Sequence, residues 1–109
     1  MKKPTLGNPQ NTIAVLQKYN FVFQKKFGQN FLIDTHVLDK IIRAAEIGKD
    51  DCVLEIGPGI GTMTQYLACA AKKVIAVEID RALIPILQDT LDGYDNVKII
   101  NEDVLKVDI

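Results

Sequence analysis

The sequence has no tryptophan, a single histidine and only two cysteines, Cys52 and Cys69. The cysteines have apolar neighbours and no Cys-x-x-Cys spacing, so the sequence gives no basis for a disulfide scaffold or a zinc site. No uninterrupted apolar run approaches the roughly 18 residues that a membrane-spanning helix requires. The amino end, Met1 to Pro4, is not followed by the apolar stretch of a signal peptide. We therefore expect a cytoplasmic protein with no membrane partner and no metal.

What the chain does have is the composition of one small globular domain. It contains 109 residues, of which 48% are hydrophobic and 25% are charged. This size permits a single hydrophobic core and leaves little room for a second catalytic lobe. The composition is typical of proteins that fold in water and differs from that of disordered or collagenous chains.

Charge is divided unevenly along the chain, although the net charge is only −1. Residues 1–49 contain eight basic and three acidic side chains, a net of +5, and residues 50–109 contain five basic and eleven acidic ones, a net of −6. Such a division allows one part of a protein to face a polyanion while another part holds a cation. Solvated surface charge is the alternative explanation, and the charge pattern alone does not separate the two.

The amino-terminal part is predicted to be a short helix followed by an aromatic loop. Apolar spacing predicts a helix over residues 11–19, which either Asn8 or Asn11 could cap. Five of the seven aromatic residues then fall between residues 19 and 31. This segment is predicted to be a loop held by aromatic anchors, although phenylalanines are more often core residues than stacking platforms for bases.

The rest of the chain alternates between strand and helix patterns, which predicts an α/β fold with a parallel sheet and right-handed crossovers. The expected elements are a helix starting at Asp34 or Thr35, a strand over 52–56, a glycine turn over 57–61 with a helix behind it, a strand over 73–78, a helix through 83–91 that Pro85 kinks or delays, and a strand over 97–100.

An acidic residue follows or ends each predicted strand. Glu55, Glu78 and Asp103 are separated by 23 and 25 residues, close to the length of one strand–helix unit. All three carboxylates should therefore reach the same carboxyl edge of the sheet, where open α/β sheets bind ligands. Glycines at positions 57, 59 and 61 let the backbone approach a ligand closely. This arrangement predicts a nucleoside site.

The glycine spacing and the acidic charge indicate which nucleoside would bind. A dinucleotide site favours Gly-x-Gly-x-x-Gly, whereas here position 62 is threonine, and no Gly-Lys-Ser/Thr follows as in a nucleotide-triphosphate loop. A pocket edged by three acids suits a ligand that carries positive charge. S-adenosylmethionine, with a sulfonium, an ammonium, a ribose and an adenine, fits these partners.

Other readings of the same residues remain open at this point. Glu55 could be a helix cap or a buried hydrogen-bond acceptor, and a glycine-rich turn alone is a weak signal. Three functions follow: the cofactor-binding part of an RNA adenine methyltransferase, a nucleotide-binding oxidoreductase domain, or a non-catalytic module that binds RNA, a nucleoside or a protein.

Four segments together resemble the ribosomal RNA adenine dimethyltransferase family, in particular the small-subunit branch associated with kasugamycin sensitivity. They are Phe27-Gly-Gln-Asn-Phe-Leu-Ile-Asp34, Glu55-Ile-Gly-Pro-Gly-Ile-Gly-Thr-Met-Thr64, Val77-Glu-Ile-Asp80 and Glu102-Asp103-Val104. The resemblance runs from about residue 9 to the end of the chain. The large-subunit branch that confers macrolide resistance shares the Gln-Asn-Phe segment and is the closest alternative.

The resemblance implies a Rossmann-like fold, S-adenosylmethionine as cofactor, and the 16S rRNA of the immature small subunit as partner. It also implies a role for individual positions. Asn30 and Leu32 would cover the methionine and sulfonium, and Gly57 would lie at the methionine moiety. Glu78 would hold the ribose, and Asp103 with the backbone of Val104 would hold the adenine. Gln29 and Glu55 would complete the wall, and Gly59 is also expected to bind the cofactor.

The target adenine would attack the sulfonium methyl through its N6, and it must be unpaired or flipped to be reached. Lys25 and Lys26, beside the phenylalanines, are the candidates for RNA contact. The family's Asn-Leu-Pro-Tyr type segment is missing, because no proline here precedes an aromatic residue. We therefore expect no catalytic residue in this chain and no activity from it alone.

Taken with the resemblance, the sequence predicts the amino-terminal portion of a longer enzyme, ending after about the third parallel strand. Residues 1–34 would form a basic extension and cofactor-covering loop, and residues 35–109 the first half of the methyltransferase domain. In this fold strand 4 lies beside strand 1, so Cys52–Ile56 is expected at an exposed sheet edge, through which the chain could self-associate.

Overall fold

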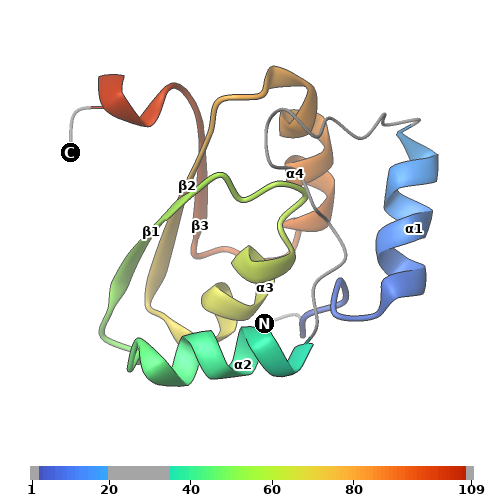
Figure 1. Cartoon of the computed structure of the whole chain (residues 1–109). Helices are drawn as coiled ribbons and strands as arrows, with labels where there is room; N and C mark the ends of the chain where they lie inside the picture. The colour runs from blue at the N-terminus through green and yellow to red at the C-terminus, as the bar shows by residue number, and fades with distance from the viewer. Residues whose placement is uncertain (1–2, 20–34, 108–109) are drawn as a thin grey trace.

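A computed structural model of the chain describes residues 3–19 and 35–107 and contains a three-stranded parallel sheet (Figure 1). The strands are β1 (Cys52–Ile56), β2 (Lys73–Glu78) and β3 (Val97–Asn101), in the order β1-β2-β3. The register pairs Ile56 with Val77 and Glu78 with Asn101. The strands therefore end together at one edge, as the spacing of the acids predicted.

Within the described residues, four α-helices and two short 3₁₀ helices accompany the sheet, and their bounds are close to those predicted. They are α1 (Pro9–Lys18), α2 (Thr35–Ala44), α3 (Thr62–Ala70), a 3₁₀ turn (Arg81–Leu83), α4 (Ile84–Thr90) and a final 3₁₀ turn (Val104–Lys106). Among the described residues, no helix is both long enough and apolar enough to cross a membrane.

Two helix starts differ from the sequence-based bounds for local reasons. Helix α1 begins at Pro9 because the Asn8 side chain accepts a hydrogen bond from the Gln10 amide at 2.9 Å. Pro85 lies in the first turn of α4, where its missing N–H costs nothing, and a 3₁₀ turn precedes that helix. The prediction that Pro85 delays the start of the α-helix is thus confirmed.

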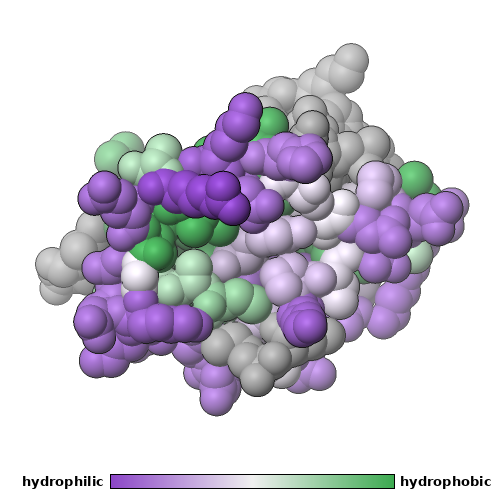
Figure 2. Space-filling model, turned by 90° about the horizontal axis from the view of Figure 1, so that it is seen from below, coloured by the Kyte–Doolittle hydropathy of each residue, from purple (hydrophilic) through white to green (hydrophobic). Residues whose placement is uncertain are grey.

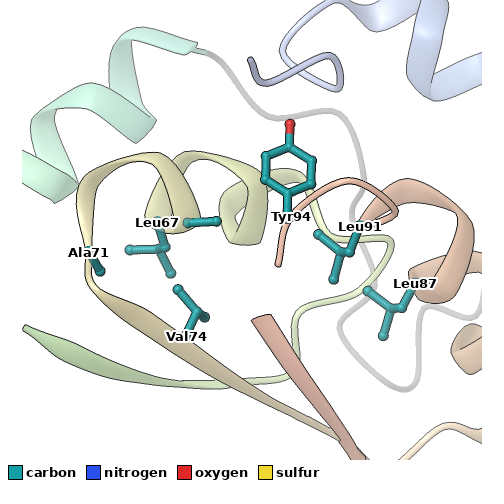
Figure 3. Packing of buried hydrophobic residues seen from close by; sticks show 7 residues of the cluster. Leu67, Ala71, Val74, Leu87, Leu91 and Tyr94 are labelled. Atoms are coloured by element: carbon teal, nitrogen blue, oxygen red, sulfur yellow. The ribbon is translucent and has the colours of Figure 1, made fainter. Parts of the chain in front are cut away.

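The main core lies between the sheet and helices α3 and α4 (Figure 3). Its buried side chains come from both helices, from β2 and from the loop before β3: Leu67, Ala68, Ala71, Val74, Leu87, Leu91 and Tyr94. Val53 of β1, Val97 and Ile99 of β3 and Ile42 of α2 pack against this cluster. Helices α2, α3 and α4 therefore bury the same face of the sheet.

The opposite face of β1 is open in the described structure. Leu54 and Ile56 alternate with the residues that face the core and are 40% and 62% exposed. Seen from below, hydrophilic residues cover much of the molecule and leave a hydrophobic area between them (Figure 2). Among the described strands, β1 has only β2 as a neighbour. It is an edge strand as expected, and self-association through it stays a prediction.

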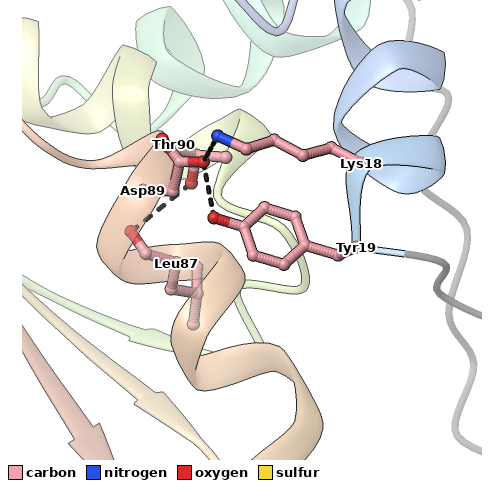
Figure 4. A network of polar contacts seen from close by, with 5 residues as sticks. All are labelled: Lys18, Tyr19, Leu87, Asp89 and Thr90. Atoms are coloured by element: carbon pink, nitrogen blue, oxygen red, sulfur yellow. Dashed lines mark hydrogen bonds and ion pairs between the residues drawn. The ribbon is translucent and has the colours of Figure 1, made fainter.

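Helix α1 packs against α4 through a second, smaller cluster. Leu6, Ile60, Leu83 and Ile86 are buried there, and Val15, Leu16 and Tyr19 pack against them. At the end of the helix, Lys18 Nζ and Tyr19 Oη both donate to the Asp89 carboxylate, at 2.7 and 2.5 Å (Figure 4). The described part of the amino-terminal extension is therefore packed on the α/β unit, and a boundary at residue 34 stays a prediction.

Candidate functional site

The glycine turn leads from the end of β1 into helix α3. Gly57, Gly59 and Gly61 have φ values of 70°, 64° and 95°, a left-handed backbone that disfavours side chains. The Gly57 amide donates to the carbonyl of Val77 at 2.9 Å, which ties the start of the turn to β2. A Cβ built on Gly57 would meet nothing within 4 Å, so this glycine borders open space. A ligand could therefore approach the backbone closely here.

Glu78, the last residue of β2, holds the turn from the side of the sheet. Its side chain is only 5% exposed. One carboxylate oxygen accepts from the Gly59 amide at 3.2 Å, and the other accepts from the Asp80 amide at 3.0 Å. Each carboxylate oxygen has about two acceptor positions. Each oxygen therefore has one backbone donor and capacity for one more.

Glu55 lies in β1 and is partly buried behind the turn. The hydroxyl of Thr64, in the first turn of α3, donates to its carboxylate. Desolvation raises the pKa of Glu55 from 4.5 to about 7; the negative charge of Glu78 also raises it, and the Thr64 hydrogen bond partly opposes the rise. The site thus holds two neighbouring acids, and the pKa of one of them, Glu55, is raised towards neutral pH.

The end of β3 is joined to the end of β2 by side-chain and backbone hydrogen bonds. Asn101 Nδ2 donates to the Glu78 carbonyl at 2.9 Å, and the Glu102 amide donates to the same carbonyl at 3.2 Å. Asp103 then caps the final 3₁₀ turn, with its Oδ1 accepting from the Leu105 amide at 3.0 Å. These bonds fix the two strand ends beside each other.

The structure also shows exposed apolar side chains at this edge that the sequence analysis missed. Ile79 is 63% exposed and Leu105 is 90% exposed, and each follows one of the acids closely. Large apolar residues at such exposure on an otherwise polar edge could pack against the flat face of a base. Their position directly after a strand-end acid is the sequence signal that could have identified them.

The predicted site residues divide into two groups. Glu55, Gly57, Gly59, Glu78, Asp103 and Val104 lie at or next to the carboxyl edge of the sheet, although their role as ligands stays a prediction. Gln29, Asn30, Leu32, Lys25 and Lys26 lie outside the described residues. Within residues 3–19 and 35–107, no group of histidine, cysteine and acidic side chains could hold a metal ion.

The sequence matches the family described as ribosomal RNA adenine dimethylase over residues 20–109. The ribosomal RNA small subunit methyltransferase A of Lachnoclostridium phytofermentans is 76% identical over 105 residues, which cover 95% of this chain and 36% of that protein. The protein of the same name in Staphylococcus carnosus is 53% identical over 109 residues, covering 100% of this chain and 37% of that one. The chain thus spans about a third of the length of these relatives.

The fold of the chain is also similar to that of solved methyltransferase structures. A dimethyladenosine transferase from Plasmodium falciparum matches with a TM-score of 0.63 and 41% identity, over 68% of this chain and 28% of that one. The 23S rRNA methyltransferase ErmE matches with a TM-score of 0.68 and 39% identity, over 73% and 33%. The predicted Rossmann-like methyltransferase fold is confirmed. The chain belongs to the ribosomal RNA adenine dimethylase family.

Proposed function

We propose that this chain is the S-adenosylmethionine-binding part of an rRNA adenine N6-dimethyltransferase that acts on small-subunit rRNA. The observation that carries the proposal is the Glu78 carboxylate, buried at the carboxyl edge of the sheet and bonded to the Gly59 amide of the glycine turn. The names of the bacterial relatives support the small-subunit rRNA as substrate over the large-subunit rRNA. Such a substrate also implies the cytoplasm as the place of action.

Glu78 has the right remaining capacity for a ribose. Its two oxygens already accept from the Gly59 and Asp80 amides, which fixes the plane of the carboxylate. One further acceptor position on each oxygen matches the two vicinal hydroxyls of a ribose. Hydrogen bonds to a charged acceptor are stronger than neutral ones, so this contact would contribute much of the affinity.

The positively charged end of the cofactor would lie towards Glu55 and the open backbone at Gly57. A sulfonium or ammonium near Glu55 lowers the pKa of that side chain, because it stabilises the charged carboxylate. Glu55, whose pKa lies near 7 without a ligand, would then lose its proton when the cation binds. The same acids that repel each other therefore favour a cationic ligand.

The adenine would lie between the ends of β2 and β3. The Asp103 oxygen that does not cap the final turn can accept from an exocyclic amine, and the neighbouring Val104 amide can donate to a ring nitrogen. The exposed side chains of Ile79 and Leu105 provide apolar surface for the flat faces of the ring. Gln29, Asn30 and Leu32 are proposed to cover the methionine side.

When bound, the cofactor supplies the methyl group, which an adenine N6 would accept in an in-line displacement. The residues of this chain would bind and orient the donor and leave the nucleophile to the RNA. Lys25 and Lys26 are proposed to contact the RNA backbone. We propose no residue of this chain as the partner of the target amine, and we expect the chain alone to transfer no methyl group.

Calorimetry with the 109-residue chain tests the proposal. S-adenosylhomocysteine and S-adenosylmethionine are each titrated into the chain, and NAD is titrated in parallel. Binding of both adenosyl ligands in preference to NAD is expected. Preferential binding of NAD would indicate an oxidoreductase domain. If none of the three ligands bound, the proposal that this chain binds the cofactor would be contradicted.

A further inference from the structure

The glycine turn is held from a second direction by a threonine that the proposed cofactor contacts do not include. Thr90 is the last residue of α4 and is only 7% exposed. Its hydroxyl donates to the carbonyl of Ile60, inside the turn, at 2.7 Å. The Leu87 carbonyl, one turn earlier in the same helix, is a much longer 3.5 Å from that hydroxyl (Figure 4). The bond to the turn is therefore the principal one.

The same hydroxyl also packs against the next residue of the turn. A Cβ built on Gly61 would lie 3.0 Å from Thr90 Oγ1 and 3.3 Å from the Leu87 and Leu91 side chains. Gly61 has a φ of 95° and precedes the first residue of α3. Thr90 thus fills the space on one side of the turn, while Glu78 holds the Gly59 amide on the other.

Thr90 is itself fixed by a buried glutamine that reaches the amino-terminal strap, which we define as residues 3–8. Gln65, in α3, is only 1% exposed. Its Nε2 donates to the Thr90 carbonyl at 2.8 Å and to Thr5 Oγ1 at 3.2 Å. Its Oε1 accepts from the amides of Thr5 and Leu6, both at 2.9 Å. A chain of buried hydrogen bonds therefore connects the strap, α3, the end of α4 and the turn.

An apolar contact runs in parallel with these bonds. Leu6 of the strap and Ile60 of the turn are 3% and 1% exposed and belong to the same buried cluster. Ile60 is thus fixed at both its carbonyl and its side chain. Buried groups with this many fixed partners have few alternative positions, because interiors are close-packed and each lost contact has a cost.

We propose that Thr90 is a positioning residue that holds the glycine turn in the shape that binds the cofactor, with the Gln65 network fixing Thr90 in place. This inference rests on the proposed function of the turn. Without the Thr90 hydroxyl, the carbonyl of the peptide between Ile60 and Gly61 loses its side-chain donor, and this peptide is held only by the bond from the Gly61 amide to the Pro58 carbonyl, at 3.0 Å. The turn then has to be ordered when the ligand binds, which reduces affinity.

The test compares three variants of the 109-residue chain by calorimetry with S-adenosylhomocysteine. Thr90→Val keeps the shape and removes the hydroxyl, and we expect about fivefold weaker binding, the typical effect of one hydrogen bond. Thr90→Ser restores the donor and should bind nearly as tightly as the unmodified chain. Asn96→Ala removes bonds to the carbonyls of Ala68 and Ala71 at the other end of α3, and should lower stability while leaving affinity unchanged.

Amide hydrogen exchange gives a second readout that does not depend on the ligand. Thr90→Val should accelerate exchange at the Gly59 and Gly61 amides, whereas Asn96→Ala should not. The inference would be overturned if Thr90→Val bound S-adenosylhomocysteine as tightly as the unmodified chain. It would also be overturned if Thr90→Val and Asn96→Ala lost the same amount of affinity. If the unmodified chain binds no adenosyl ligand, the proposed function fails. In that case, exchange at the Gly59 and Gly61 amides that is the same in Thr90→Val and in the unmodified chain would show separately that Thr90 does not position the turn.

Discussion

Two polar networks contact helix α3, and they differ in whether their hydrogen-bonding capacity is used. In the Gln65 network, the amide oxygen accepts two hydrogen bonds and the amide nitrogen donates two, so the side chain has no capacity left. At the carboxyl edge of the sheet, each oxygen of Glu78 accepts from one backbone amide and can accept another. The first network is complete in the folded chain alone, and the second has room for a ligand.

The electrostatics follow the same division. Gln65 is neutral, and its burial needs only the four hydrogen bonds that it makes. The carboxyl edge holds Glu78 close enough to Glu55 for the charge of Glu78 to raise the pKa of Glu55. Repulsion between like charges is relieved either by a proton or by a cation. The Gln65 network therefore stabilises the fold and, through Thr90, the turn, whereas the carboxyl edge is the part that we propose contacts the ligand directly.

The largest expected effect on stability is that of Gln65→Ala. The change leaves the Thr5 and Leu6 amides and the Thr90 carbonyl without a partner and opens a cavity. Buried groups left unpaired cost about 1–3 kcal/mol each, partly recovered by relaxation. We expect a loss of at least about 3 kcal/mol in the free energy of unfolding, measured by urea denaturation.

Gln88→Ala is the matched control for this change. Gln88 is an exposed glutamine of α4, so its truncation should leave the urea midpoint nearly unchanged. If Gln65→Ala unfolded at the same urea concentration as Gln88→Ala, the claim that the Gln65 network stabilises the fold would be wrong.

The next effect is a dependence of stability on pH that comes from Glu55. Its pKa is about 7 in the folded chain, against 4.5 for a glutamate side chain in water, so the folded chain binds the proton more tightly than the unfolded chain. The contribution of Glu55 to the free energy of unfolding should therefore be largest below about pH 4.5 and should fall as the pH rises towards 7. The full difference is on the order of 3 kcal/mol.

Glu55→Gln isolates this contribution. The amide stays neutral throughout, so the decrease in unfolding free energy between about pH 5 and pH 7.5 should become smaller in this variant. Affinity for S-adenosylmethionine should rise over the same pH range in the unmodified chain, with release of a proton measurable in buffers of different ionisation enthalpy. If the stability of Glu55→Gln and of the unmodified chain depended equally on pH, the pKa of Glu55 would not be raised in the folded chain.

The smallest effect is expected for Lys18→Ala, which removes the exposed ion pair between Lys18 and Asp89. The Lys18 and Asp89 side chains are 64% and 38% exposed. Exposed ion pairs contribute little, because water and salt screen them. The thermal midpoint and the affinity for S-adenosylhomocysteine should both be nearly unchanged, and a large shift in either would mean that the docking of α1 depends on this pair.

The sequence predicts the order of the elements well because each is specified by local pattern. The strand bounds at 52–56 and 73–78 agree with the structure. The Gln65 network was not predicted. Its partners Thr5 and Gln65 are 60 positions apart in the chain, and no local pattern indicates that a glutamine inside a helix will be buried.

The carboxyl edge was predictable in part for the same reason. One acid for each strand–helix unit is a local spacing, and parallel strands bring such positions to one edge. The hydrogen bond from the Gly59 amide to Glu78 depends on the register between β1 and β2, which local sequence patterns do not predict. The raised pKa of Glu55 likewise depends on burial by residues of other elements.

The most direct test of the account is the affinity of Glu78→Ala for S-adenosylhomocysteine, measured by calorimetry beside Asp95→Ala. Asp95 is an exposed acid in the loop before β3, at the amino end of that strand. Glu78→Ala would remove the two hydrogen bonds that we propose from the ribose to this charged acceptor, and we expect binding at least about 100-fold weaker. Asp95→Ala should bind like the unmodified chain. Equal affinity of a folded Glu78→Ala and the unmodified chain would contradict the claim that the spare acceptors at this edge hold the cofactor.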